Sequence, residues 1–393
     1  MDIFEKCYKF TRAEEARQNG YYPYYIPIQG SSATEVIVDG KKKVMIGSNN
    51  YLGLTHHPKI MAAAQEAMFK YGTGCTGSRF LNGTLDLHEV LEKRLAEFIG
   101  VEACLVFSTG FQTNLGIIDT LLGKNDAVIV DKLAHASIVD ACRLSYGETY
   151  RFRHNDPEDL ERILKKVSAH RGKLIVVEGI YSMEGDIAVL PALVKVAKRY
   201  EARLMVDDAH ALGVLGEGGR GSSHHFHLQG MVDLVMGTFS KSFACIGGFV
   251  AGEGRVIDYL KHHARTLIFS ASMPPSAVAT VLVALEVMLE EPERIEHLWR
   301  NARKMWKGFS ELGFNIGGSE SPVVPVIIGD DMKTFSFWRR LMNAGIFANP
   351  VISPAVPEKS ARLRTSYIAT HTDEQLNFVL ETFKRIGKEE GLI

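Results

Sequence analysis

Cysteine is scarce in this 393-residue chain, and positive charge is not in excess. The five cysteines are scattered, odd in number and without a C-x-x-C spacing, which argues against disulfides or a zinc site and fits a reducing cytoplasm. The 45 basic residues are balanced by 46 acidic ones, and no long Lys/Arg block stands out, so there is no electrostatic case for nucleic acid. No apolar run approaches the ~20 residues of a membrane-spanning helix. The N-terminal residues lack the basic-then-apolar pattern of a signal peptide.

Hydrophobic residues, in contrast, make up 46% of the chain, which is enough for a large core. Between about residues 58 and 270, helical patterns alternate with short apolar runs. The expected helices are 58–70, 87–99, 111–122, 157–167 and 191–200, and the expected strands are 103–107, 127–130, 174–177, 204–206, 234–236 and 248–251. Continuous apolar strands between helices predict an α/β fold with a mainly parallel sheet covered on both faces.

The pattern changes after about Pro274, where two long helical stretches lead to a strand, and a further helix, two strands and a final helix follow. We therefore predict an N-terminal arm over residues 1–45, a large domain over 46–275 and a smaller α+β domain over 276–393. Within the arm, Asp39-Gly40 lies between two strand-like runs and predicts a two-residue hairpin, because both residues tolerate the positive φ angles of a type I′ turn.

Two polar segments follow predicted strands of the large domain. Asp207 and His210 follow the strand 204–206, and Lys241 follows 234–236 in the segment Gly237-Thr238-Phe239-Ser240-Lys241. Ligands of parallel sheets bind at the carboxyl ends of strands, where these side chains fall. Pyridoxal 5′-phosphate (PLP) requires a lysine for a Schiff base, a carboxylate for the pyridine nitrogen and donors for the phosphate. The sequence therefore predicts a PLP site.

Other motifs have a structural alternative beside the functional one. A helix cap and a hydrogen-bonded core histidine would also explain Asp207 and His210, and a lone His135 is more often structural than stacked on a ring. Gly110-Phe111 resembles a strand-to-helix turn whose amides suit a phosphate. Arg364 is a candidate clamp for a substrate carboxylate, although a solvated strand arginine is the alternative.

Two further patterns are weaker. Residues 72–77 match G-x-G-x-x-G, but they follow a helical stretch rather than a strand, so a dinucleotide site is not expected. Three histidines within 223–227 have no acid or cysteine ligands grouped with them, and we predict no metal site there.

Taken together, these motifs resemble the α-oxoamine synthases, the fold-type I PLP enzymes that condense an amino acid with an acyl-CoA. The resemblance runs over nearly the whole chain, and the segments that carry it are 48–54, 77–79, 182–186, 206–210 and Lys241. It implies a large PLP-binding domain, a smaller C-terminal domain and a homodimer whose sites lie at the subunit interface.

The resemblance also implies a role for each candidate residue. Lys241 would hold PLP and act as the catalytic base, Asp207 would contact the pyridine nitrogen, and His210 would bond the ring oxygen. His135 would stack on the ring. Asn49 and Arg364 would contact the substrate. The phosphate side would be served by Gly110, Phe111, Thr238 and Ser240, with Ser182 nearby, and by Ser270 and Ala271 of the partner chain.

Four segments are most similar to bacterial members that condense L-serine with a long-chain acyl-CoA: 80–86, 237–242, 349–357 and 369–372. The resemblance thus implies palmitoyl-CoA as acyl donor and 3-ketodihydrosphingosine as product, in a cytoplasmic enzyme for which peripheral contact with the inner membrane is left open. Residues 362–365 instead read like 2-amino-3-ketobutyrate CoA ligases, which remain an alternative, as does a cysteate-using acyltransferase. A non-catalytic PLP-binding regulator is the alternative of another class.

Overall fold

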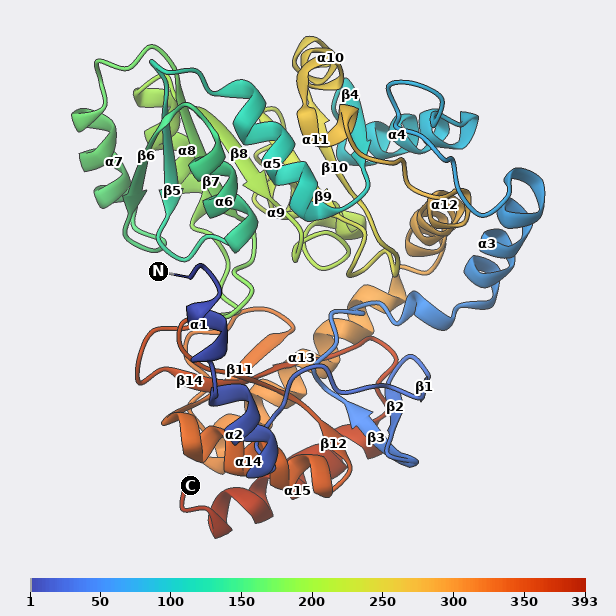
Figure 1. The fold of residues 1–393 in the computed structure, drawn as a ribbon, viewed down its shortest axis with the longest axis vertical. Coiled ribbons are helices and arrows are strands. Elements are labelled where there is room, and N and C mark those ends of the chain that lie inside the picture. The colour runs from blue at the N-terminus through green and yellow to red at the C-terminus, as the bar shows by residue number, and fades with distance from the viewer. Residues whose placement is uncertain (1) are drawn as a thin grey trace.

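The computed structural model describes residues 2–393, which form two lobes joined by long helices (Figure 1). The upper lobe contains a seven-stranded sheet in the order β4-β10-β9-β8-β7-β5-β6. Strand β10 is antiparallel to both neighbours, and the other pairings are parallel. The strands are β4 (Ala103–Phe107), β5 (Ala127–Asp131), β6 (Glu148–Phe152), β7 (Lys173–Glu178), β8 (Arg203–Asp207), β9 (Leu234–Thr238) and β10 (Gly248–Gly252).

Helices cover both faces of this sheet, because its strands are apolar on both sides. In β5, Val128 and Val130 point into one core, whereas Ala127 and Ile129 point into the opposite one. The first core is closed by α5 (Gly110–Leu121), α6 (Ala136–Leu144), α10 (Gly254–His263) and α11 (Arg265–Ile268). The opposite face is closed by α4 (Asp86–Ile99), α7 (Pro157–Lys166), α8 (Leu190–Arg199) and α12 (Pro275–Glu290), with α3 (Pro58–Tyr71) packed on α12. The prediction of a mainly parallel sheet covered on both faces is confirmed.

The lower lobe combines two segments from opposite ends of the chain (Figure 1). A three-stranded antiparallel sheet is formed by β11 (Val323–Gly329), β14 (Ala361–Ser366) and β13 (Asn349–Val351), beside α13 (Glu293–Leu312), α14 (Asp331–Asn343) and α15 (Asp373–Glu389). A second sheet contains β1 (Gly30–Ser31), β2 (Glu35–Val38), β3 (Lys41–Met45) and β12 (Ile346–Phe347). In it β12 runs parallel to β3, so Val44 and Met45 pair with Ile346 and Phe347 of the C-terminal part of the chain. The predicted domain boundaries at residues 46 and 276 stay a prediction.

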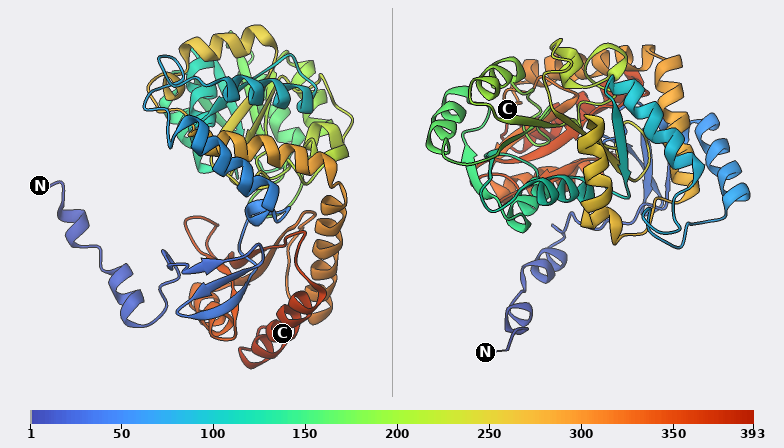
Figure 2. Two further views of the ribbon diagram at one scale, coloured as in Figure 1. Left: turned by 90° about the vertical axis from the view of Figure 1, so that its right-hand side faces the viewer. Right: turned by 90° about the horizontal axis from the view of Figure 1, so that it is seen from above.

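Most elements lie within a few residues of their predicted bounds. The Asp39-Gly40 hairpin is confirmed, with φ angles of 50° and 68° between β2 and β3. The sequence analysis missed β6 and the helices α10 and α11. The first helices, α1 (Glu5–Tyr8) and α2 (Arg12–Gln18), lie on a segment that extends away from the body (Figure 2). Within residues 2–393, no helix has the length and apolarity needed to cross a membrane.

Candidate active site

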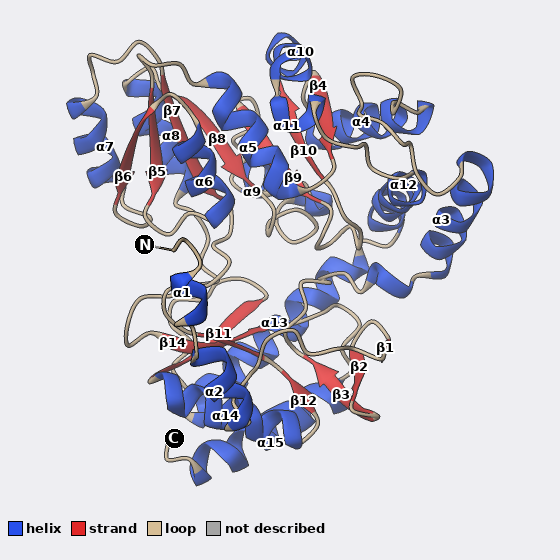
Figure 3. Ribbon diagram, in the orientation of Figure 1, coloured by secondary structure: helices blue, strands red, loops and turns tan. Residues whose placement is uncertain are grey.

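A cavity of about 580 Å³ lies at the carboxyl edge of the seven-stranded sheet. Figure 3 colours the helices, the strands and the loops that follow the strands of this sheet. All the site residues predicted from the sequence line this cavity except Ser270 and Ala271. Those lining it are Asn49, Gly110, Phe111, His135, Ser182, Asp207, His210, Thr238, Ser240, Lys241 and Arg364.

Lys241 lies in the loop between β9 and β10 and opens on the cavity. Burial lowers the pKa of its amine to about 8, and the nearby carboxylates of Asp207 and Glu178 oppose this shift. Since an unperturbed lysine has a pKa of about 10.4, far more of this amine is uncharged near neutral pH. Such a lysine can act as a nucleophile or as a base.

Asp207 is the last residue of β8 and is buried. Its two carboxylate oxygens accept hydrogen bonds from the Asn114 side-chain amide at 2.8 Å and from the Ala209 backbone N–H at 3.0 Å. Both donors stabilise the charged carboxylate. Asn114 lies in α5 and lines the cavity. The sequence analysis missed it, because nothing in its neighbourhood marks it as different from a core-facing helix position.

A second buried acid, Glu178, also lines the cavity and was missed. It ends β7 and accepts a hydrogen bond from the His135 backbone N–H at 2.6 Å. Burial, reinforced by Asp207, raises the pKa of Glu178 well above its usual value. The available signal was an acid directly after the predicted strand 174–177, the same pattern that pointed to Asp207.

His135 caps α6 and has a defined ring orientation. Its Nδ1 accepts a hydrogen bond from the Ser137 backbone N–H at 3.2 Å. Burial lowers the pKa of His135, so a neutral ring carries its proton on Nε2. The fixed, planar ring suits stacking on an aromatic ligand, as the sequence predicted; that role stays a prediction.

The phosphate end of the predicted site has its donors in place. The hydroxyls of Thr238 and Ser240 lie 2.9 Å apart, and Gly110 begins α5. A Cβ atom on Gly110 would lie 2.8 Å from Thr238 Oγ1, so the glycine allows close approach of this helix N-terminus to the hydroxyls. A helix N-terminus with nearby hydroxyls is a ready anion site.

Arg364 is buried in β14 and turned toward the cavity. Its Nε donates to the Ser182 carbonyl at 3.0 Å, whereas Nη2 is buried and has no partner within residues 2–393. Asn49 Oδ1 is buried without a partner in the same part of the described chain. Buried polar groups left unpaired are costly unless a ligand completes them. Arg364 Nη2, the lysine amine and the hydroxyl pair fit an anionic cofactor with a carboxylate-bearing substrate. Asn49 Oδ1 is an acceptor and fits a donor group of such a substrate.

Ser270 and Ala271 lie in a separate segment after α11. Ser270 Oγ accepts from Gln112 Nε2 at 2.9 Å, and the Ala271 carbonyl accepts from the Ser108 hydroxyl. Their predicted contribution to the pocket of a partner chain stays a prediction.

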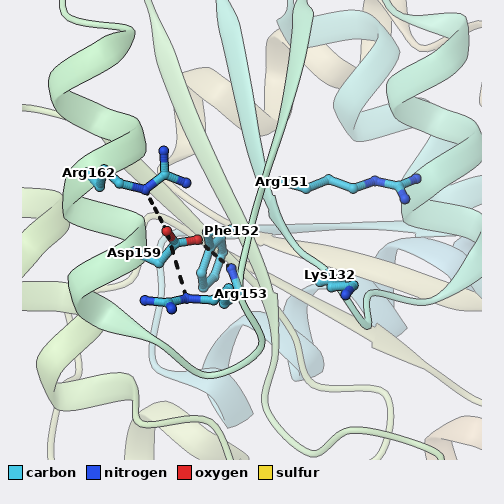
Figure 4. A pocket seen from close by; sticks show the side chains of 6 residues that line it. All are labelled: Lys132, Arg151, Phe152, Arg153, Asp159 and Arg162. Atoms are coloured by element: carbon cyan, nitrogen blue, oxygen red, sulfur yellow. Dashed lines mark hydrogen bonds and ion pairs between the residues drawn. The ribbon is translucent and has the colours of Figure 1, made fainter. Parts of the chain in front are cut away.

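A second cavity, of about 500 Å³, lies near the edge strand β6 (Figure 4). It is lined by Lys132, Arg151, Phe152, Arg153, Asp159 and Arg162. Its one acid is already paired, because Asp159 Oδ1 accepts from Arg162 Nε at 2.7 Å and Oδ2 from the Arg153 backbone N–H at 2.7 Å. None of the predicted site residues lies there, so we assign the chemistry to the cavity around Lys241.

Comparison with known proteins agrees with this assignment. The family model for aminotransferases of class I and II matches residues 41–383. The chain belongs to this family. It is 51% identical over 387 residues to a serine palmitoyltransferase of Sphingobacterium spiritivorum, and the aligned region covers 98% of this chain and 97% of the relative. It is 44% identical to an 8-amino-7-oxononanoate synthase of Thermoanaerobacter pseudethanolicus, with 97% of each chain covered. The resemblance predicted from the sequence is thereby confirmed.

Solved structures of serine palmitoyltransferases have the same fold as this chain. The Sphingomonas wittichii serine palmitoyltransferase superposes with a TM-score of 0.97 at 39% identity, with 100% of both chains covered. A serine palmitoyltransferase of S. paucimobilis with a bound PLP–myriocin aldimine matches with the same score, identity and coverage. The predicted fold class, a fold-type I PLP enzyme, is confirmed.

Proposed function

We propose that this protein is a PLP-dependent serine palmitoyltransferase. It condenses L-serine with palmitoyl-CoA or another long-chain acyl-CoA and releases CoA, carbon dioxide and 3-ketodihydrosphingosine, the first step of sphingolipid synthesis. The observation that carries this proposal is 51% identity to a serine palmitoyltransferase over 98% of the chain. The cavity around Lys241 supplies side chains suited to that chemistry.

PLP fits the residues of the cavity. Lys241 would hold it covalently, Asp207 would lie at the pyridine nitrogen, and the Thr238–Ser240 hydroxyls with the first turn of α5 would bind the phosphate. When bound, PLP delocalises the charge that develops on the α-carbon of an amino acid. Asp207 maintains the charge of the pyridine nitrogen, since a nearby carboxylate raises the pKa of a cationic partner.

The remaining residues act on the amino acid itself. The Lys241 amine removes the α-proton, for which burial has already lowered its pKa to about 8. Arg364 receives the serine carboxylate through Nη2, which lacks a partner in the described chain. Asn49 Oδ1, also without a partner there, is an acceptor and takes a hydrogen bond from a donor group of the substrate. Selective cleavage requires the breaking bond to stand perpendicular to the cofactor ring, and His135 and Arg364 set that angle.

The working unit in this proposal is a homodimer with Ser270 and Ala271 completing the partner's phosphate pocket. Large apolar side chains near that segment are highly exposed in the single chain, with Phe269 at 75% and Leu81 at 78%. Exposed apolar surface of this kind is typical of subunit interfaces. We place the enzyme in the cytoplasm and leave peripheral contact with the inner membrane open.

The decisive experiment is incubation of the purified protein with L-serine and palmitoyl-CoA, followed by mass spectrometry of the lipid extract. A 3-ketodihydrosphingosine signal that requires both substrates supports the proposal. Glycine, L-alanine and cysteate are run in parallel, because another synthase of the group would form its product with one of them instead. A regulator that only binds PLP would give no product with any amino acid.

A further inference from the structure

A buried tyrosine lies directly behind His210. Tyr51 is 1% exposed, and its hydroxyl oxygen is 2.7 Å from His210 Nδ1. The segment that carries it is fixed between the lobes, since the Tyr51 carbonyl accepts a hydrogen bond from the Ala369 backbone N–H at 2.8 Å. The contact is therefore a short hydrogen bond between two buried side chains. Which of the two atoms donates the proton determines whether His210 Nε2, on the other side of the ring, is a donor or an acceptor.

The surroundings of the hydroxyl fix that direction. Its second polar neighbour is the Arg364 guanidinium, whose positive charge opposes the rise that burial causes in the pKa of Tyr51. Burial prevails, so the hydroxyl keeps its proton. A guanidinium has only donors and cannot accept that proton. The remaining acceptor is His210 Nδ1, and a buried hydroxyl that failed to donate would cost free energy.

The ring of His210 is neutral. Burial, followed by the positive charges of Lys241 and Arg364, lowers the pKa of His210 well below its usual value. With Nδ1 accepting from Tyr51, the single ring proton must be on Nε2. Nε2 makes no hydrogen bond to any residue of the described chain, and His210 lines the cavity.

We propose that Tyr51 is a positioning residue that holds His210 with its proton on Nε2, so that His210 presents a hydrogen-bond donor to the cofactor. This inference rests on the proposed function in one respect, namely that the ligand is PLP, whose ring oxygen is anionic and needs a donor. With the proton on Nδ1 instead, His210 would turn a lone pair toward that oxygen and repel it. Tyr51 thereby stabilises the ring oxygen without touching it.

The test is to observe the His210 ring nitrogens in the holoenzyme by NMR after labelling histidine rings with ¹⁵N, and a His210→Gln variant assigns the signals. The wild type is expected to show a protonated Nε2 and an unprotonated Nδ1. In Tyr51→Phe, a fraction of the rings should carry the proton on Nδ1. Tyr367→Phe is the matched control, since Tyr367 is equally buried and its hydroxyl accepts from Thr365 Oγ1 at 3.2 Å, away from His210.

A second measurement follows the visible absorbance band of the bound cofactor as the pH is raised, in the absence of substrate. Loss of a donor to the charged ring oxygen should raise the pH midpoint of this absorbance change in Tyr51→Phe by up to about one pH unit. The other groups facing His210, namely Lys241, Arg364 and His135, are unchanged in the variant and in the control.

A wild-type His210 with its proton on Nδ1 would overturn the inference, and this result does not require that Tyr51→Phe folds. A Tyr51→Phe spectrum identical to that of the wild type would overturn it as well. Failure of the proposed function has a different signature. No 3-ketodihydrosphingosine would form from serine and palmitoyl-CoA, whereas the His210 spectra of the PLP-loaded protein would be unaffected.

Discussion

Single residues of the cavity owe their chemistry to burial, and Lys241 is the clearest case. Replacing it with alanine removes the amine on which the covalent link to PLP depends. We expect Lys241→Ala to lose the visible absorbance of the holoenzyme and all product formation. Lys261→Ala, which removes an exposed lysine of α10, should keep both. Normal turnover by Lys241→Ala would refute the assignment of this residue.

The pKa of Lys241 predicts how fast the apoenzyme takes up PLP at each pH. Only the uncharged amine attacks the aldehyde, so the rate should rise about tenfold per pH unit below the pKa and level off above it. The midpoint of this profile is expected near pH 8, the value to which burial lowers the pKa of Lys241, and not near the pKa of a free lysine. The measurement is the growth of visible absorbance after mixing apoenzyme with PLP.

The carboxylate of Asp207 raises the pKa of Lys241. Asp207→Asn should therefore move the midpoint of the uptake profile to lower pH. A midpoint above pH 10 in the wild type would show that Lys241 is not held in a buried environment. An unchanged midpoint in Asp207→Asn would show that the two side chains do not interact.

Residue types at strand ends were predictable because they follow local patterns. Asp207 and Lys241 each follow a short apolar run, and the covalent chemistry of PLP requires both. Glu178 shows the same local pattern and could have been found in this way. Tyr51 and Asn114 were not found, because they reach the cavity residues through contacts with segments remote in sequence. Tyr51, for example, meets His210 from 159 residues away. Ring orientation and hydrogen-bond direction therefore required the folded structure.

At the scale of elements, the start of α5 positions the phosphate end of the site. Gly110→Ala would place a methyl group 2.8 Å from Thr238 Oγ1 and force the helix and strand apart. We expect the Kd for PLP to rise about tenfold or more, in line with overpacking costs of 1–3 kcal/mol. Gly318→Ala, where the added methyl would meet no atom within 4 Å, should leave the Kd unchanged. Equilibrium titration of the apoproteins with PLP provides the comparison.

The contact between α4 and β4 depends on a buried ion pair. Glu92 Oε1 lies 2.7 Å from Arg79 Nη1 and also accepts from the Val106 backbone N–H at 3.0 Å. Their side chains are only 12% and 6% exposed. Breaking such a pair leaves an uncompensated charge, so Glu92→Gln should lower the free energy of unfolding by about 3 kcal/mol. Denaturant titration measures this, with Glu89→Gln on the exposed face of the same helix as the control.

Elements with a strong apolar period were predictable, whereas others lacked any such signal. The edge strand β6 has only Phe152 buried, so its residues show no continuous apolar run. Helix α10 has two buried residues, Ile257 and Leu260, and a polar remainder. The parallel pairing of β3 with β12 joins residues about 300 positions apart, and the hydrophobic pattern of either strand alone does not specify its partner.

At the scale of the whole molecule, the carboxyl edge of the seven-stranded sheet, where Lys241 lies, is next to an exposed apolar surface. The segments 78–84 and 267–272 are joined by the bridge between Ser78 and Ala271, and they expose Leu81 and Phe269. Water contact with two such side chains is unfavourable by a few kcal/mol. A second copy that covers this surface would at the same time bring its Ser270 and Ala271 to the neighbouring phosphate pocket.

We therefore expect Phe269→Glu to disrupt both assembly and cofactor binding. Light scattering should give twice the 43.6 kDa chain mass for the wild type and a mass near that of one chain for the variant. Its Kd for PLP should rise as well, because the pocket then lacks the partner's residues. Met332→Glu, on an exposed face of α14 in the other lobe, should remain dimeric with an unchanged Kd. A Phe269→Glu dimer that binds PLP normally would place the subunit interface elsewhere.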